Sequence, residues 1–199
     1  MIKIDGFDTD YKIADYENLE KILTDIMEDE RLKGRVITDV LVNGETFSEI
    51  YPHQAEDMDV ASITSIEIKS EPLDKMALEM SGEMHKVTTL MANGARNVGK
   101  LFREDKTTDA LELLQDVLDV TRDFMGTITK LRDQYLGGAD EEFVNKTEEL
   151  SNLVTEMSEV MESEDWVLLS DLLEYEFAPL CEDWRVIGEK IHKQIKAAS

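Results

Sequence analysis

The hydrophobic period of the sequence changes at Glu71-Pro72, and this change constrains the fold more than any other feature. Before it, apolar residues alternate with polar ones in short runs separated by turn residues, which is typical of strands. After it, apolar residues recur every three or four positions to the end of the chain, which is typical of amphipathic helices. Proline disfavours helix in the residue before it and can itself begin one. We therefore predict two parts, a small α/β module over residues 1–70 and a helical part over residues 73–199.

Short strands and one helix are predicted at the start of the module. Ile2 and Ile4 alternate with polar residues and predict a half-buried strand. Residues 11–13 are compatible with a second short strand. Asp15 stands where an N-cap is expected, and the apolar face behind it predicts a helix that ends around residues 32–34.

The rest of the module predicts a hairpin and a final strand. Residues 35–42 carry apolar side chains on both faces, which indicates a strand buried on both sides. Asn43-Gly44 supplies the two positive-φ residues of a type I′ turn, so the chain should return from Thr46. Residues 63–70 form the last predicted strand. This order of elements resembles a β-grasp, the ubiquitin-like topology, and a truncated ferredoxin-like arrangement is the alternative; neither determines function.

Four long amphipathic helices are predicted after Pro72. Their expected ranges are residues 73–102, 108–135, 140–161 and 163–196. Gly137-Gly138 should end the second helix, and Ser163 should cap the fourth. Pro179 would cost about 3 kcal/mol in a helix interior, so the fourth helix should kink or divide near it. Short connections favour antiparallel packing. The predicted class is α+β, a β-grasp-like module followed by an antiparallel all-α bundle of four long helices.

Charge and cysteine content exclude several classes of partner and compartment. The chain has 45 acidic and 21 basic residues and a formal net charge of −24, which opposes binding to nucleic acids or anionic membranes. Cys181 is the single cysteine, so no internal disulfide is possible, which fits a reducing compartment. The first residues lack the apolar core of a signal peptide, and no apolar run is long enough to span a membrane. We expect a cytoplasmic protein.

The sequence contains no convincing catalytic, cofactor or metal motif. A di-iron bundle needs two Glu-x-x-His pairs, whereas Glu189 and His192 form the only one. Acidic neighbours disfavour a reactive thiolate at Cys181, and no glycine-rich phosphate loop is present. We therefore predict no catalytic residue, no cofactor and no bound metal.

Two side-chain patterns on the first long helix are candidate partner-binding features. Met76, Met80, Met84 and Met91 lie along one side, and methionine both fills cores and lines adaptable binding surfaces. The second pattern is a cationic stripe at helical spacing, which would suit an acidic partner or simply complement the helix dipole. Its residues are Arg96, Lys100 and Arg103.

These features favour a non-enzymatic interaction protein, such as an adaptor, an assembly factor or an export-chaperone-like module. Its expected partner is another protein that presents a basic or amphipathic segment. One alternative is a structural homodimer formed through a coiled-coil-like seam in residues 140–161. The other is an enzyme whose site cannot be recognised from sequence.

Overall fold

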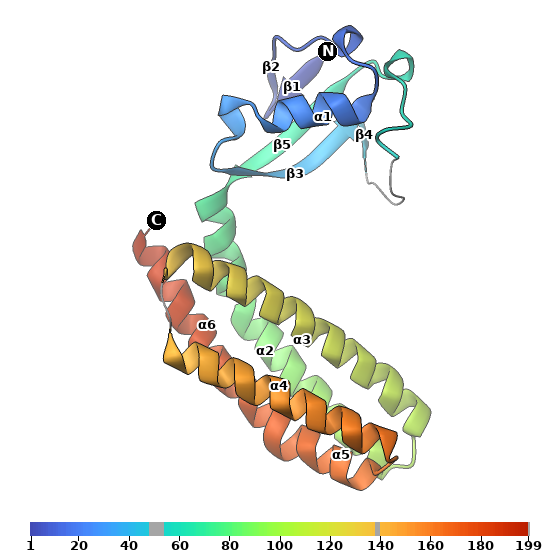
Figure 1. Ribbon diagram of the computed structural model, residues 1–199, viewed down its shortest axis with the longest axis vertical. Helices are drawn as coiled ribbons and strands as arrows, with labels where there is room; N and C mark the ends of the chain where they lie inside the picture. The colour runs from blue at the N-terminus through green and yellow to red at the C-terminus, as the bar shows by residue number, and fades with distance from the viewer. Residues whose placement is uncertain (48–53, 138–139, 199) are drawn as a thin grey trace. The chain divides into compact units, whose positions relative to one another are not determined.

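A computed structural model describes residues 1–47, 54–137 and 140–198 and shows a mixed α+β protein. The chain divides into two compact units, Met1–Met76 and Ala77–Ser199. The predicted α+β class is confirmed, because a five-stranded sheet is followed by helices (Figure 1).

The sheet of the first unit is mixed. Its strands are β1 (Ile2–Ile4), β2 (Phe7–Asp8), β3 (Arg35–Val42), β4 (Glu45–Thr46) and β5 (Ile66–Pro72). They are ordered β2-β1-β5-β3-β4, with β1 parallel to β5 and the other neighbours antiparallel. Asn43 and Gly44 have φ values of 55° and 85°, so the predicted tight turn between β3 and β4 is confirmed.

Helix α1 (Leu19–Met27) covers one face of this sheet, and the predicted cap at Asp15 is wrong. Asp15 instead ends a 3₁₀ turn, and the extended residue Asn18 accepts a hydrogen bond from the Lys21 backbone N–H at 3.1 Å. The helix also ends earlier than predicted, because a second 3₁₀ turn begins at Glu30. Leu19, Ile22 and Ile26 are its buried residues.

Two other predictions for this unit fail for local reasons. The short second strand lies at Phe7–Asp8 rather than at residues 11–13, because the turn after β1 is tight and Gly6 takes a φ of 82°. Strand β3 is not buried on both sides, since Thr38 and Asp39 are exposed. The pairing register shifts between Ile37 and Asp39, which interrupts the simple alternation of faces.

Five α-helices follow in the described residues of the second part of the chain. They are α2 (Leu73–Arg103), α3 (Thr107–Tyr135), α4 (Glu141–Glu162), α5 (Trp166–Leu172) and α6 (Ala178–Ala198). Gly137, with a φ of 55°, follows the end of α3 as predicted, while Gly138 lies outside the described residues. The predicted cap at Ser163 is wrong: Ser163 ends α4, and Asp165 caps α5 by accepting a hydrogen bond from the Leu168 backbone N–H.

Pro179 explains the break between α5 and α6. A π-helical turn over Leu173–Phe177 joins the two helices immediately before the proline. Proline cannot donate a backbone hydrogen bond to the preceding turn, and a wider turn relieves this constraint without ending the helix. The predicted kink or division near Pro179 is therefore confirmed, in the form of a π-helical turn.

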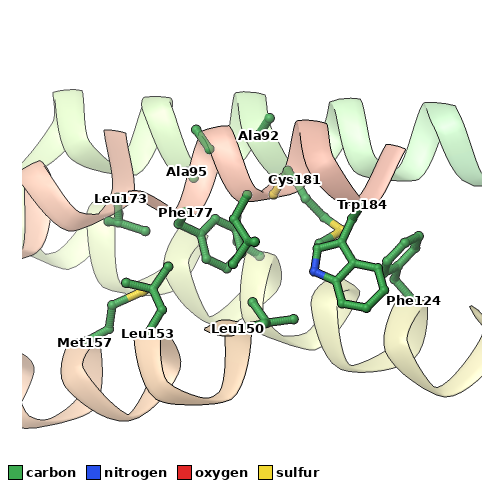
Figure 2. Close-up of a cluster of buried hydrophobic side chains, with 14 of the residues drawn as sticks. Ala92, Ala95, Phe124, Leu150, Leu153, Met157, Leu173, Phe177, Cys181 and Trp184 are labelled. Atoms are coloured by element: carbon green, nitrogen blue, oxygen red, sulfur yellow. The ribbon is translucent and has the colours of Figure 1, made fainter. Parts of the chain in front are cut away.

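The segment formed by α5, the π turn and α6 lies against each of the other long helices. It meets α2 where Ser81 Oγ lies 2.9 Å from His192 Nδ1. It meets α3 through Trp184, which packs against Phe124 (Figure 2), and it meets α4 because the same indole packs against Phe143. Trp184 and Phe177 are both 0% exposed, so this last segment supplies the centre of the hydrophobic core.

Candidate functional site

An open apolar groove with a volume of about 400 Å³ lies between α3 and α4. Figure 1 shows these two helices running in opposite directions along the helical unit. The lining residues are Leu118, Thr121, Arg122 and Met125 of α3, with Thr147, Leu150, Ser151, Val154 and Thr155 of α4. We call this feature the α3/α4 groove.

Trp184 of α6 packs against both helices that form the α3/α4 groove. Its indole ring packs edge-to-face against Phe124 of α3, with centroids 6.0 Å apart, and against Phe143 of α4, at 5.1 Å. Figure 2 shows Trp184 reaching from α6 to Phe124, with Leu150 of α4 nearby. Because an indole is too large to let α3 and α4 close over it, their outer faces remain separated. Trp184 Nε1 is buried without a hydrogen-bond partner in the described structure, which indicates that the residue acts through its size.

The three threonine hydroxyls in the groove donate hydrogen bonds to backbone carbonyls of their own helices. Thr121 Oγ1 donates to the Val117 carbonyl at 2.7 Å, and Thr147 Oγ1 donates to the Phe143 carbonyl at 2.8 Å. Thr155 Oγ1 likewise donates to the carbonyl of Ser151 at 2.9 Å. Hydroxyls that bond to their own helix leave methyl groups as the available contact surface. The groove is therefore suited to apolar side chains more than to a polar small molecule.

Carboxylates dominate the edges of the groove. The one cation in its wall, Arg122, is paired with Asp119 at 2.8 Å and with Asp123 at 3.2 Å. On α4, Glu148 adjoins Thr147 and Glu159 lies one helical turn beyond Thr155, and both are exposed. Helix α4 as a whole contains seven glutamates and one lysine. An apolar groove with acidic edges favours a ligand that is apolar on one face and cationic at its flanks.

The structure separates the four methionines named from sequence. Met84 and Met91 are 7% and 1% exposed and belong to the hydrophobic core of the helical unit. Met80 is 40% exposed, and Met76 is half-buried at the end of the first unit. These side chains do not line the α3/α4 groove. The two buried methionines fill the space between helices of the same chain.

The three cations of the predicted stripe are exposed, and their contacts lie within the chain. Arg103 binds Asp171 at 3.0 Å and also Glu174, which raises the pKa of its guanidinium above the ordinary value. Lys100 lies 3.7 Å from Glu104, and Arg96 donates a hydrogen bond to the Asn93 side chain. Arg103 therefore fastens the end of α2 to the π turn and α5.

Cys181, Glu189 and His192 make contacts within the chain that stabilise the fold. Burial raises the pKa of Cys181 to about 12, so its thiol stays protonated at neutral pH. Glu189 accepts from Arg185, and His192 pairs with Ser81. Within residues 1–47, 54–137 and 140–198, no group of three or more His, Cys, Asp or Glu side chains could hold a metal ion. No described helix has a stretch long and apolar enough to cross a membrane.

The sequence did not predict the α3/α4 groove, although its residues belong to the apolar faces of the helices predicted at residues 108–135 and 140–161. Leu118 and Met125, like Leu150 and Val154, occur at core spacing and do not differ in type from buried neighbours. Thr121 and Thr147 were the available signal, because each places a hydroxyl within an otherwise apolar face. Two hydroxyl-bearing positions on different helices would not by themselves have shown that the helices face each other.

Two family models match the chain, on either side of the junction between its parts. Residues 1–71 are similar to the Domain of unknown function (DUF8043). Residues 79–187, more than half of the chain and the whole of the α3/α4 groove, match the Domain of unknown function (DUF8042). Comparison with curated proteins and with solved structures finds no match. The chain therefore belongs to the family described as Domain of unknown function (DUF8042).

Proposed function

We propose that this protein is a non-enzymatic interaction module, such as an adaptor, assembly factor or export-chaperone-like protein. Its partner inserts a basic amphipathic helix into the α3/α4 groove. The observation that carries this proposal is an open apolar groove whose only wall cation is neutralised by its neighbours. Docking of an amphipathic helix into a hydrophobic groove is a recurring mode of peptide recognition.

The dimensions of the groove support a helical ligand. Leu118 and Met125 are seven residues apart on α3, which corresponds to roughly 10 Å along the helix axis. Thr147 and Thr155 define a similar length on α4. A groove of this length accepts about two turns of a helix, with apolar anchors at positions i, i+3 or i+4, and i+7.

The charge of α4 favours a basic helix over a second copy of the chain. Seven glutamates on α4 would face seven more if two copies paired through this helix, and like charges would oppose the contact. A homodimer through residues 140–161 remains the second candidate, because Thr147 and Val154 of that seam are accessible in the groove. Phe143, Leu150 and Met157 of the same seam are already buried in the chain's own core.

Fluorescence anisotropy with synthetic helical peptides tests the proposal. One labelled peptide carries leucines on one face and lysines on the other, and a matched peptide carries glutamates in place of the lysines. We expect the lysine peptide to bind and the glutamate peptide to bind far more weakly. Static light scattering of the protein alone tests the homodimer.

Two variants distinguish groove binding from general attraction to an acidic surface. Val154→Glu places a charge inside the groove, whereas Asn152→Glu adds the same charge at an exposed position of α4 outside it. We expect Val154→Glu to weaken binding of the lysine peptide by more than about tenfold, since a buried unpaired charge is costly. Equal affinities for the two variants, or no binding by the wild type, would contradict the proposal.

We also propose that the module predicted over residues 1–70 forms a β-grasp, supported by the order β2-β1-β5-β3-β4 and the parallel pairing of β1 with β5. We propose further that α5, the π turn and α6 act as one rod, which gives a four-helix antiparallel bundle. The single buried cysteine supports a reducing compartment such as the cytoplasm.

A further inference from the structure

Glycine in a helix interior needs a physical reason, because it lowers helix stability relative to alanine. Four of the five glycines in the described helices have such a reason within the chain. For each, the position that a Cβ atom would occupy lies within 4 Å of another helix. These residues are Gly82 beside His192, Gly94 beside Val117, Gly99 beside Ser170, and Gly188 beside Met84.

Gly126 is the exception. It is exposed, and no atom of a neighbouring element lies within 4 Å of the position where its Cβ would be. The described glycines outside the helices all have positive φ values, which explains their residue type. Among the described residues, Gly126 is thus the one glycine whose bare backbone serves no contact or turn in the chain.

The position of Gly126 connects it with the α3/α4 groove. It directly follows Met125 and lies one helical turn after Arg122, and both of these residues line the groove. The surface of α3 at this edge is therefore exposed backbone with no side chain above it. Such a surface allows another helix to approach more closely than any side chain would permit.

We propose that Gly126 is the point of closest approach between α3 and the partner's basic amphipathic helix. This inference rests on the proposed function of the groove and adds a requirement for the partner. The partner helix carries a small residue, such as alanine or glycine, where it crosses Gly126, while its larger apolar residues enter the groove. Its cationic flank meets the carboxylate of Glu148 at the α4 edge of the groove.

The test compares Gly126→Ala and Gly126→Gln with wild type and with Thr89→Gln, a control at an exposed position of α2 outside the groove. The ligand is the labelled leucine–lysine peptide, with an alanine at the centre of its apolar face. We expect Gly126→Gln to weaken binding by about tenfold or more, from steric exclusion, and Gly126→Ala to weaken it less. Thr89→Gln should leave the affinity unchanged.

Thermal unfolding of the same variants provides the second measurement. Both substitutions at Gly126 should raise the midpoint of unfolding, because alanine and glutamine favour helix and nothing in the chain obstructs their side chains. A more stable protein that binds more weakly is the specific signature of a contact glycine. If the wild type binds and Gly126→Gln binds equally well, the role of Gly126 is refuted while groove binding stands. If the wild type does not bind, both proposals fail.

Discussion

Two pairs of helices in the helical unit have similar amphipathic faces, but one pair packs closely and the other leaves an open groove. Where α2 meets α5 and α6, which we call the glycine seam, backbones come close: a Cβ on Gly99 would lie 3.2 Å from the Ser170 carbonyl oxygen. Ser170 Oγ also donates to the Gly99 carbonyl there, at 3.2 Å. In the α3/α4 groove, by contrast, Trp184 keeps the helices apart and a volume of about 400 Å³ stays open.

This difference shows that a few residues at each contact set the distance between neighbouring helices of the helical unit. Glycines bring the seam together because they remove the side chains that would otherwise separate the helices. One indole separates the groove because it packs against aromatic rings on both walls. The faces of α2, α3 and α4 are otherwise alike in their apolar spacing.

Of the substitutions that test this comparison, removal of the Trp184 indole should change the free energy of unfolding the most. Trp184→Ala deletes a fully buried side chain at the centre of the core, and we expect a loss of about 4 kcal/mol in the free energy of unfolding. Chemical denaturation followed by circular dichroism measures this loss. Trp166→Ala is the control, since Trp166 is only half-buried where it stacks on Phe102, and its cost should be clearly smaller. Equal losses for the two variants would show that Trp184 is not the central spacer.

The next largest effect should come from filling the glycine seam. Gly99→Leu would force a side chain against the Ser170 backbone, and we expect it to lower the free energy of unfolding by about 3 kcal/mol. Gly126→Leu on the open side of α3 provides the matched control and should be neutral or stabilising. Urea unfolding of both variants checks the contrast. A destabilising Gly126→Leu would mean that the groove edge is as closely packed as the seam.

The reactivity and titration of Cys181 test whether the core next to the glycine seam excludes water. Its side chain is buried in the core of the helical unit (Figure 2), and burial raises its pKa to about 12. Above the unfolded-state pKa of about 8.5, the unfolded chain loses the thiol proton and the native chain keeps it. Stability from this group is therefore complete below pH 8.5 and is lost as pH rises toward 12, by about 2 kcal/mol at pH 10.

The measurement is the pH dependence of unfolding for the wild type and Cys181→Ala. The difference between the two proteins should shrink or reverse between pH 8.5 and 10, because only the wild type carries the titrating thiol. A cysteine placed in the groove by Thr155→Cys, in a Cys181→Ala background, should instead react with iodoacetamide at the rate of an exposed thiol. Rapid modification of Cys181 in the native wild type would show that the seam admits solvent.

The smallest effect should come from the ion pairs at the end of the seam. Arg103 joins α2 to Asp171 and Glu174, but its side chain is 43% exposed. Exposed ion pairs are individually weak, so Arg103→Gln should cost about 1 kcal/mol or less at low salt. Thermal melts at low and high salt measure the loss, which should decrease as salt screens the pairs. A cost that is large and independent of salt would make Arg103 a packing residue.

The division of the chain into an α/β part and helices followed from local patterns in the sequence. The start of α2 was predictable from Glu71-Pro72, and the turn between β3 and β4 from Asn43-Gly44. Boundaries failed where several residues could serve as a cap: Asn18 rather than Asp15 begins α1, and Asp165 rather than Ser163 begins α5. Capping depends on the backbone angles of one residue, and neighbouring Asp, Ser and Asn residues compete for that role.

The α3/α4 groove was not predictable in the same way. The seam predicted in residues 140–161 contained Val154 and Leu150 at the right spacing, but spacing does not tell which partner a face meets. Met84 and Met91 show the same limit for a buried face. They belong to the core, although their residue type also suits a binding surface.

The sequence by itself determined the class of each part, the positions of most helices and the acidic charge, because these depend on neighbours along the chain. Only the tertiary structure decided which apolar faces are covered, since coverage depends on the distances between helices. Gly99 and Gly126 are both glycines within long amphipathic helices. The backbone of Ser170 packs against Gly99, whereas Gly126 faces open space. The cause is steric: a bare backbone draws helices together only where another helix is free to approach, and Trp184 keeps α4 from approaching α3.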